Sequence, residues 1–165
     1  MKKKNLLLML LAVMALLLIP VSVQAAAAKP GTVKLSSIKA VDYNKINIKW
    51  KKPSGKFTNY CIYYREKNSN GKWIKIKTVN NKTLSYTHTS SAKYPIVTGE
   101  TYQYTVRAYN KKSKQYGNYN KSGLTTKTRP QQVKLTGISY DEDEGVTITW
   151  NKAGGAYLYR VYCKI

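Results

Sequence analysis

TGETYQYTVRA, residues 98–108, is the segment that constrains the fold of this chain most strongly. From Tyr102 to Ala108 every second residue is aromatic or aliphatic, and the residues between them are polar. A period of two places these sets on opposite faces of a β-strand, one buried and one facing solvent. The Thr-Gly pair that precedes the series marks the turn leading into the strand.

Two earlier segments show the same period of two. INIKW spans residues 46–50, and YCIYYR spans residues 60–65. In each segment one alternate set is apolar or aromatic, which predicts a second and a third half-buried strand. The inward sets of the three strands form the predicted core, namely Ile46, Ile48, Trp50, Tyr60, Ile62, Tyr64, Tyr102, Tyr104 and Val106.

Turn-forming residues separate seven segments of this kind, and none of them has a sustained helical period. The predicted strands are residues 33–42, 45–52, 58–67, 72–79, 83–88, 101–110 and 119–128. Seven short strands at this spacing predict an all-β, antiparallel, two-sheet sandwich.

The tryptophan that closes the second strand, together with YCIYYR and TGETYQYTVRA, resembles a fibronectin type III domain. The resemblance implies an immunoglobulin-like sandwich over residues 30–128, with Tyr102 as the corner residue of the family's tyrosine corner. NYNK at residues 118–121 departs from the family pattern, which more often has Ser and Pro there. The chain also lacks Arg-Gly-Asp, so the integrin binding of some family members is not expected.

Residues 29–55 recur one hundred positions later as RPQQVKLTGISYDEDEGVTITWNKAGG. The identical positions are mostly apolar or turn residues, as expected for two copies of one packed unit. We therefore predict a complete module at 29–128 and an incomplete second module at 129–165, with Tyr159 and Val161 in its third strand. Without partner strands this piece is expected to be poorly ordered by itself, with Trp150 exposed, and to belong to a longer tandem protein.

Residues 1–28 are predicted to be a secretory signal peptide. Three lysines precede an apolar run from Leu6 to Ile19, and small residues follow it as far as Ala28. The run is shorter than the roughly 20 residues that span a bilayer. We expect cleavage after Ala25, with Ala27 or Ala28 as alternatives, no transmembrane segment afterwards, and a secreted or extracellular protein, with association with the cell wall left open.

The expected mature chain is strongly basic. Without the three leader lysines, 26 basic and 7 acidic residues remain, a net charge of +19. Such a field attracts polyanions, although a genome rich in A and T would also produce this abundance of Lys. With only four arginines in the chain, specific nucleic-acid recognition is not expected.

The sequence indicates no catalytic, cofactor or metal site, and therefore no enzyme. His88, the single histidine, is expected to be structural and to face solvent. Cys61 and Cys163 lie at non-equivalent positions of the two repeats and are expected to stay unpaired. The acidic run 141–144 aligns with the turn between the first two strands, which favours a solvated turn over a calcium site.

Tyr63, Arg107 and Tyr109 are expected to face outward on two neighbouring strands, where they could form a flat platform for sugar rings. The alternative is that outward tyrosines simply suit β-strands. The face occupied by Trp73 is left open.

The resulting functional prediction is a monomeric, non-catalytic structural or interaction module that spaces or presents domains at the bacterial cell surface, with an extracellular protein as its partner. The alternative is a binding module for anionic cell-wall polymer or polysaccharide, accessory to a catalytic domain beyond the C-terminus.

Overall fold

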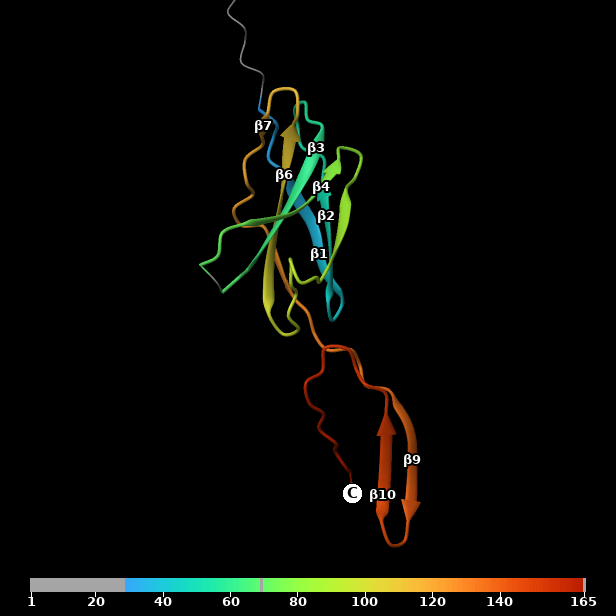
Figure 1. The fold of residues 1–165 in the computed structure, drawn as a ribbon. Coiled ribbons are helices and arrows are strands. Elements are labelled where there is room, and N and C mark those ends of the chain that lie inside the picture. The colour runs from blue at the N-terminus through green and yellow to red at the C-terminus, as the bar shows by residue number, and fades with distance from the viewer. Residues whose placement is uncertain (1–28, 69, 165) are drawn as a thin grey trace, which may run out of the picture.

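The structure, a computed structural model, describes residues 29–68 and 70–164. The predicted signal peptide therefore lies outside the described residues. Strands β1 to β8 form a two-sheet sandwich, and β9 and β10 form a hairpin that extends from one end of it (Figure 1). The predicted all-β sandwich is confirmed.

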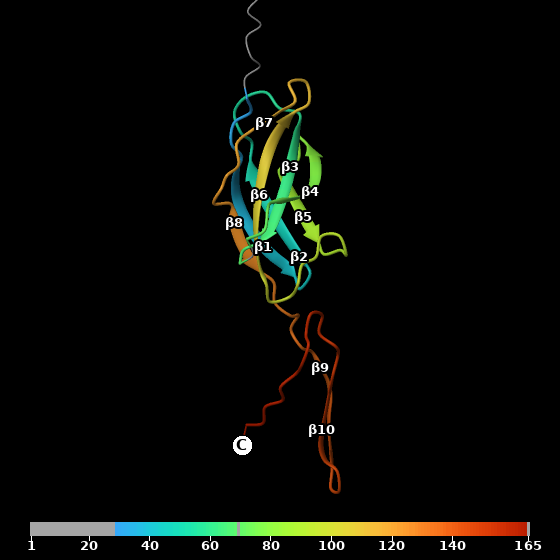
Figure 2. The same ribbon diagram turned by 60° about the vertical axis from the view of Figure 1, so that its left-hand side comes forward.

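The first sheet of the sandwich has the order β1-β2-β5. These strands are Lys34–Asp42, Lys45–Lys51 and Ser85–Thr89. The second sheet has β4 (Ile74–Asn80), β3 (Asn59–Glu66) and β6 (Thr101–Asn110) in that order. Two short strands, β7 (Gln115–Tyr116) and β8 (Leu124–Lys127), both pair with β6 (Figure 2). Every pairing in the two sheets is antiparallel.

The seventh predicted strand, residues 119–128, is wrong in its first half. No ladder forms over residues 117–123, which separate β7 from β8. Side chains of β6 bind the backbone of this segment instead. Thr105 Oγ1 donates to the Asn120 carbonyl at 3.0 Å, and Arg107 Nε donates to the Gly117 carbonyl at 2.8 Å. These side chains satisfy carbonyls that a regular strand would pair with backbone N–H groups.

The core lies between the two sheets. All nine residues of the predicted core belong to one buried cluster. Trp50 is 3% exposed, and its ring packs edge-on against Tyr60 at a centroid distance of 5.4 Å. Edge-to-face packing of buried rings adds to the stability that comes from burying their area.

Tyr102 makes the contact that the family resemblance implied. Its phenol oxygen accepts a hydrogen bond of 2.8 Å from the backbone N–H of Val97. The ring is buried while its hydroxyl reaches the preceding turn. This bond fastens the turn at residues 97–100 to the start of β6.

The hairpin repeats the register of the first two strands. β9 is Leu135–Asp141 and β10 is Gly145–Trp150. Leu135 faces Trp150 just as Leu35 faces Trp50, and the same irregularity follows each leucine. The equivalence continues into the turns, where Gln131 N bonds Gly154 O at 2.9 Å and Gly31 N bonds Ser54 O at 2.9 Å.

The third strand predicted for the second repeat, around Tyr159 and Val161, does not form. Residues 156–164 contain no strand. In the first repeat the corresponding strand, β3, is bonded on both sides, by β4 and β6. The described part of the second repeat has no counterparts of those two strands, so its third segment has no ladder to join.

Trp150 is half-buried rather than exposed. Its ring lies 5.5 Å from that of Tyr159, whose hydroxyl accepts a hydrogen bond of 2.8 Å from Ala153 N. The rest of the hairpin face is open, because Val146 is 61% exposed whereas its equivalent Ile46 is fully buried. This difference in exposure arises because the second sheet covers Ile46 in the first repeat, whereas no such sheet covers Val146 in the described part of the second.

Candidate interaction surface and repeat junction

The outer face of the second sheet carries a row of arginine and aromatic side chains. Alternation along β3 and β6 turns Arg65 and Arg107 away from the core. The guanidinium carbon of Arg107 lies 4.1 Å from the ring centroid of Tyr119 and 4.7 Å from that of Tyr116. Both distances are in the range of cation–π attraction.

The row continues in both directions from Arg107. On one side, the Tyr116 ring packs against Tyr109 at 4.3 Å. On the other, Tyr119 stacks on Trp73 at 6.3 Å, and Arg65 lies 4.6 Å from the Trp73 centroid. We call this set the arginine–aromatic row, consisting of Arg65, Trp73, Tyr119, Arg107, Tyr116 and Tyr109. All six side chains are half-buried.

Hydrogen bonds fix both guanidinium groups. Arg107 Nε is held by the Gly117 carbonyl, and Arg65 Nε donates to Gln103 Oε1 at 2.8 Å. Gln103 is itself held, because its Nε2 donates to the Ser122 carbonyl at 2.7 Å. The segment between β7 and β8 thus helps to position the row.

The structure does not show the flat platform predicted from Tyr63, Arg107 and Tyr109. Tyr63 is 8% exposed and lies below Tyr119, with their rings edge-on at 5.4 Å. Burial raises the pKa of Tyr63, since the phenolate would be poorly solvated there. Tyr63 therefore supports the row from beneath.

Sequence reasoning found Arg107 and Tyr109 but missed the other four members of the row. Three of these, Trp73, Tyr116 and Tyr119, lie outside the long strands, where a period of two assigns no face. Arg65 had a usable signal, because it shares the outward phase of β3 with Tyr63.

His88 does not face solvent as predicted; it is 2% exposed on β5. Its Nδ1 lies 2.7 Å from the Tyr104 hydroxyl, and its Nε2 lies 3.2 Å from the Tyr94 carbonyl. Burial lowers the pKa of His88, and the bond to the Tyr94 backbone opposes this shift in part. The alternation along β5 could have predicted this burial. His88 and Tyr86 occupy alternate positions of β5, and they pair with Ile46 and Ile48, which face the core.

The remaining candidate groups of the sequence are separated in space or exposed. Cys61 is buried, Cys163 is exposed, and both are free thiols. Asp141 closes the β9–β10 turn by accepting the N–H groups of Asp143 and Glu144, and these bonds lower its pKa. No group of three or more potential metal ligands occurs within residues 29–68 and 70–164.

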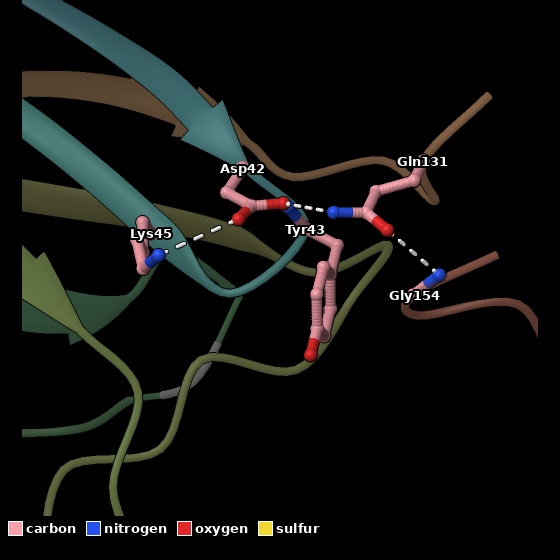
Figure 3. Close-up of polar contacts among 5 residues, drawn as sticks. All are labelled: Asp42, Tyr43, Lys45, Gln131 and Gly154. Carbon is pink, nitrogen blue, oxygen red and sulfur yellow. Dashed lines mark hydrogen bonds and ion pairs between the residues drawn. The ribbon is translucent and has the colours of Figure 1, made fainter.

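The junction between the repeats is a second site that sequence reasoning did not find. The side chain of Gln131 bridges the two repeats (Figure 3). Its Nε2 donates to Asp42 Oδ1 of the β1–β2 turn at 2.9 Å, and its Oε1 accepts from Gly154 N at 3.0 Å. Asp42 Oδ1 also accepts a hydrogen bond from Tyr43 N. The bond from Tyr43 N lowers the pKa of Asp42 most, and the bond from Gln131 lowers it further.

Close backbone approach completes the junction. A Cβ atom on Gly154 would lie 2.4 Å from Tyr43 Cε1, so a side chain there would collide with the tyrosine ring. Gly155 has a φ of 75°, and a Cβ atom there would lie 2.5 Å from Thr98 Oγ1. Thr98 in turn donates to the Tyr43 carbonyl at 3.2 Å. Glycine at both positions lets the second repeat contact Tyr43 and Thr98 directly.

The family model described as "Fibronectin type III domain" matches residues 28–121, more than half of the chain of 165 residues. The chain belongs to the fibronectin type III family. The matched range covers the sandwich from before β1 to the segment that carries Tyr119. Among curated proteins, none matches the chain.

One solved structure of a type III domain shares this fold, and two further structures are similar with lower scores. A human fourth type III domain is 18% identical with a TM-score of 0.51, covering 66% of this chain and 87% of its own. The FN5 domain of Drosophila Lar is 23% identical with a TM-score of 0.43, covering 62% of this chain and 97% of its own. The d3–d4 region of rat CD45 is 21% identical with a TM-score of 0.46, and the match covers 62% of this chain and 51% of the CD45 chain.

A type III module of this kind offers surfaces for interaction. Its two candidate features are the arginine–aromatic row on the outer face of the second sheet and the junction beside the turn that precedes β6. In the described part of the chain, no helix is long and apolar enough to cross a membrane.

Proposed function

We propose that this protein is an exported, non-catalytic structural and interaction module that holds its neighbouring repeat in a fixed orientation, and so spaces or presents domains at the cell surface. The observation that carries the proposal is the Gln131 bridge between Asp42 and Gly154. A flexible tether would need no such contact.

The connection between the repeats supports a stiff arrangement. Thr128, directly after β8, is fully buried, and its Oγ1 donates to the Val97 carbonyl at 3.4 Å. Its own carbonyl accepts from Gly99 N at 3.1 Å. Pro130 follows, with a fixed φ angle. The chain is thus held up to the point where the second repeat begins, unlike a Gly/Ser-rich linker, which behaves as a random coil.

The family supports the non-catalytic part of the proposal. Type III modules serve as structural or interaction units, and the titratable groups of this module are dispersed. His88 is enclosed by tyrosines, and its nearest acidic residue in sequence, Glu100, lies in the turn before β6. This arrangement supports a module that presents surfaces rather than one that carries out chemistry.

The test is ¹⁵N relaxation of the purified protein and two variants. Gln131→Ala removes both side-chain contacts of the bridge, whereas Gln132→Ala changes an exposed neighbour of the same type. We expect the amides of β9 and β10 to share the correlation time of β3 and β6 in the wild type and in Gln132→Ala. In Gln131→Ala the hairpin amides should show faster, independent motion.

Two results would overturn the proposal. One is a wild-type hairpin that already tumbles independently of the sandwich. The other is a Gln131→Ala variant whose hairpin remains coupled to the sandwich as firmly as in Gln132→Ala.

A further inference from the structure

The arginine–aromatic row takes no part in the junction between the repeats, and its side chains could bind a ligand. Arg107 lies between Tyr116 and Tyr119, and Tyr119 also stacks on Trp73. The faces of these rings are therefore engaged by a guanidinium or by another ring. A neutral sugar that stacks flat on an aromatic face would have to displace them. The row instead presents ring edges and guanidinium edges to a ligand.

The guanidinium groups are oriented in advance of binding. A guanidinium carries five N–H donors in a rigid fork, and the bonds of Arg65 to Gln103 and of Arg107 to Gly117 use the donor on Nε. An arginine held in this way loses little side-chain entropy when it binds an anion. Its planar fork matches the two oxygens of a carboxylate.

The charge around the row favours an anionic ligand. Exposed Lys75 lies opposite Tyr63 in the register of β3 and β4, and Lys111 and Lys112 follow the end of β6 at Asn110. Two of the three acidic residues of the module, Asp42 and Glu100, lie at the junction end of the strands. The third, Glu66, alternates with Arg65 and so points to the other side of β3.

The two arginines are spaced for an extended ligand. Arg65 faces Gln103 in the ladder, and Gln103 precedes Arg107 by four residues on β6. At a rise of about 3.3 Å per residue, the backbone positions of the two arginines are about 13 Å apart along the strand. The stacked rings of Trp73 and Tyr119 lie between the two guanidinium groups. A single small anion cannot contact both, whereas a polymer with repeated charges can.

We propose that the arginine–aromatic row binds an acidic polysaccharide, with Arg65 and Arg107 each pairing with a sugar carboxylate. The half-buried edges of Trp73 and Tyr119 supply apolar contact for the C–H groups of the sugar rings between the two carboxylates, and Tyr116 supplies it beyond Arg107. This apolar contact is the reason for choosing an acidic sugar polymer over a plain polyanion. The binding site lies on the second sheet, so it is independent of the Gln131 junction.

The test measures the affinity of the purified protein for polygalacturonate at physiological ionic strength, where the diffuse field of the surface lysines is screened over about 8 Å. Arg107→Lys and Arg65→Lys keep the charge but remove the planar fork. Each should weaken binding at least about tenfold. Lys49→Ala removes one exposed charge from the opposite sheet and should change the affinity far less.

Each variant is first shown to be folded by circular dichroism, and its unfolding midpoint is recorded. Loss of affinity in either arginine variant at a temperature where it is fully folded supports the site. Unchanged affinity in both variants, or an equal loss in Lys49→Ala, overturns it, because the binding would then depend only on overall charge.

Two further polymers test the class of ligand. Neutral dextran should bind far more weakly than polygalacturonate, and binding of equal strength would contradict a role for the guanidinium groups. Long-chain polyphosphate should also bind more weakly than polygalacturonate at the same ionic strength. Equal affinity with the same dependence on Arg107 would overturn the assignment to a sugar polymer.

Discussion

The Nδ1 atom of His88 lies 2.7 Å from the hydroxyl oxygen of Tyr104, inside the core of the sandwich. The second ring nitrogen faces the carbonyl of Tyr94, which can only accept a hydrogen bond. Nε2 must therefore carry the proton, and Nδ1 accepts from the Tyr104 hydroxyl. The arrangement requires a neutral imidazole, and a second proton would have to displace the tyrosine hydrogen.

The stability of the module should consequently depend on His88 protonation. The folded-state pKa lies below the unfolded value of 6.5, so the unfolded chain binds the proton more readily. The free energy of unfolding should be highest above about pH 6.5 and decrease as the pH falls toward the folded-state pKa. Below that pKa, His88 is protonated in both states, so it should cause no further decrease. Because the chain has a single histidine, His88→Gln should be flat over the same range in denaturant titrations. An equal decrease in both proteins between pH 7.5 and 5 would refute this assignment.

Trp50 should dominate the stability of the first module. Trp50→Ala removes a ring that is 3% exposed and should cost about 3–5 kcal/mol, a large part of the roughly 5–15 kcal/mol typical of a domain. Lys49→Ala, one residue earlier and exposed, should have little effect. Similar denaturant midpoints for the two variants would contradict the register of β2.

The two repeats provide a matched pair of positions on β2 and β10. Ile46 is fully buried, and its equivalent Val146 is 61% exposed. Ile46→Ala should lower the unfolding free energy of the module by about 2–5 kcal/mol, whereas Val146→Ala should leave it nearly unchanged. A comparable loss in both variants would mean that the face of the hairpin is covered in solution.

The contact between Tyr43 and Gly154 should be sensitive to a single methyl group. Gly154→Ala places a Cβ atom 2.4 Å from the ring of Tyr43 and should displace the second repeat. Nuclear Overhauser contacts between the Tyr43 ring and residue 154 would then weaken or disappear. The double variant Tyr43→Ala, Gly154→Ala removes the collision with the ring but leaves the new Cβ atom 2.8 Å from Gln131 Oε1, so the second repeat should return only part of the way to its original position. Retention of the ring contact in the single variant would show that the junction is looser than the structure indicates.

Limited proteolysis should cut first in residues 156–164, where no strand forms and Tyr157 and Tyr162 are 85% and 82% exposed. The β9–β10 hairpin should be cut more slowly, since its backbone groups are paired. Cleavage within β9 before any cut in 156–164 would contradict this order.

The strands and the core were predictable because both depend on short-range alternation. A period of two assigns a face to each residue of β2, β3 and β6, and the nine core residues follow from it. The seventh strand was not predictable in the same way, because Thr105 and Arg107 bind its backbone through their side chains. Such contacts join distant residues and leave no periodic signal.

The two candidate sites depend on contacts of that long-range kind. Arg107 could be placed on the outer face, but its position between Tyr116 and Tyr119 depends on how the segment after β7 folds back. Tyr63 was given the correct side of β3, yet the ring of Tyr119 covers it. The bridge from Gln131 to Asp42 joins residues 89 positions apart. Only the placement of the two repeats in space brings them together.

Residual dipolar couplings of the backbone amides test most directly whether the repeats share one fixed orientation. We predict that a single alignment tensor fits the couplings of β3 and β6 together with those of β9 and β10. Couplings of the hairpin that require a separate tensor, or that are uniformly reduced toward zero, would contradict a rigid junction and with it the proposed spacing function.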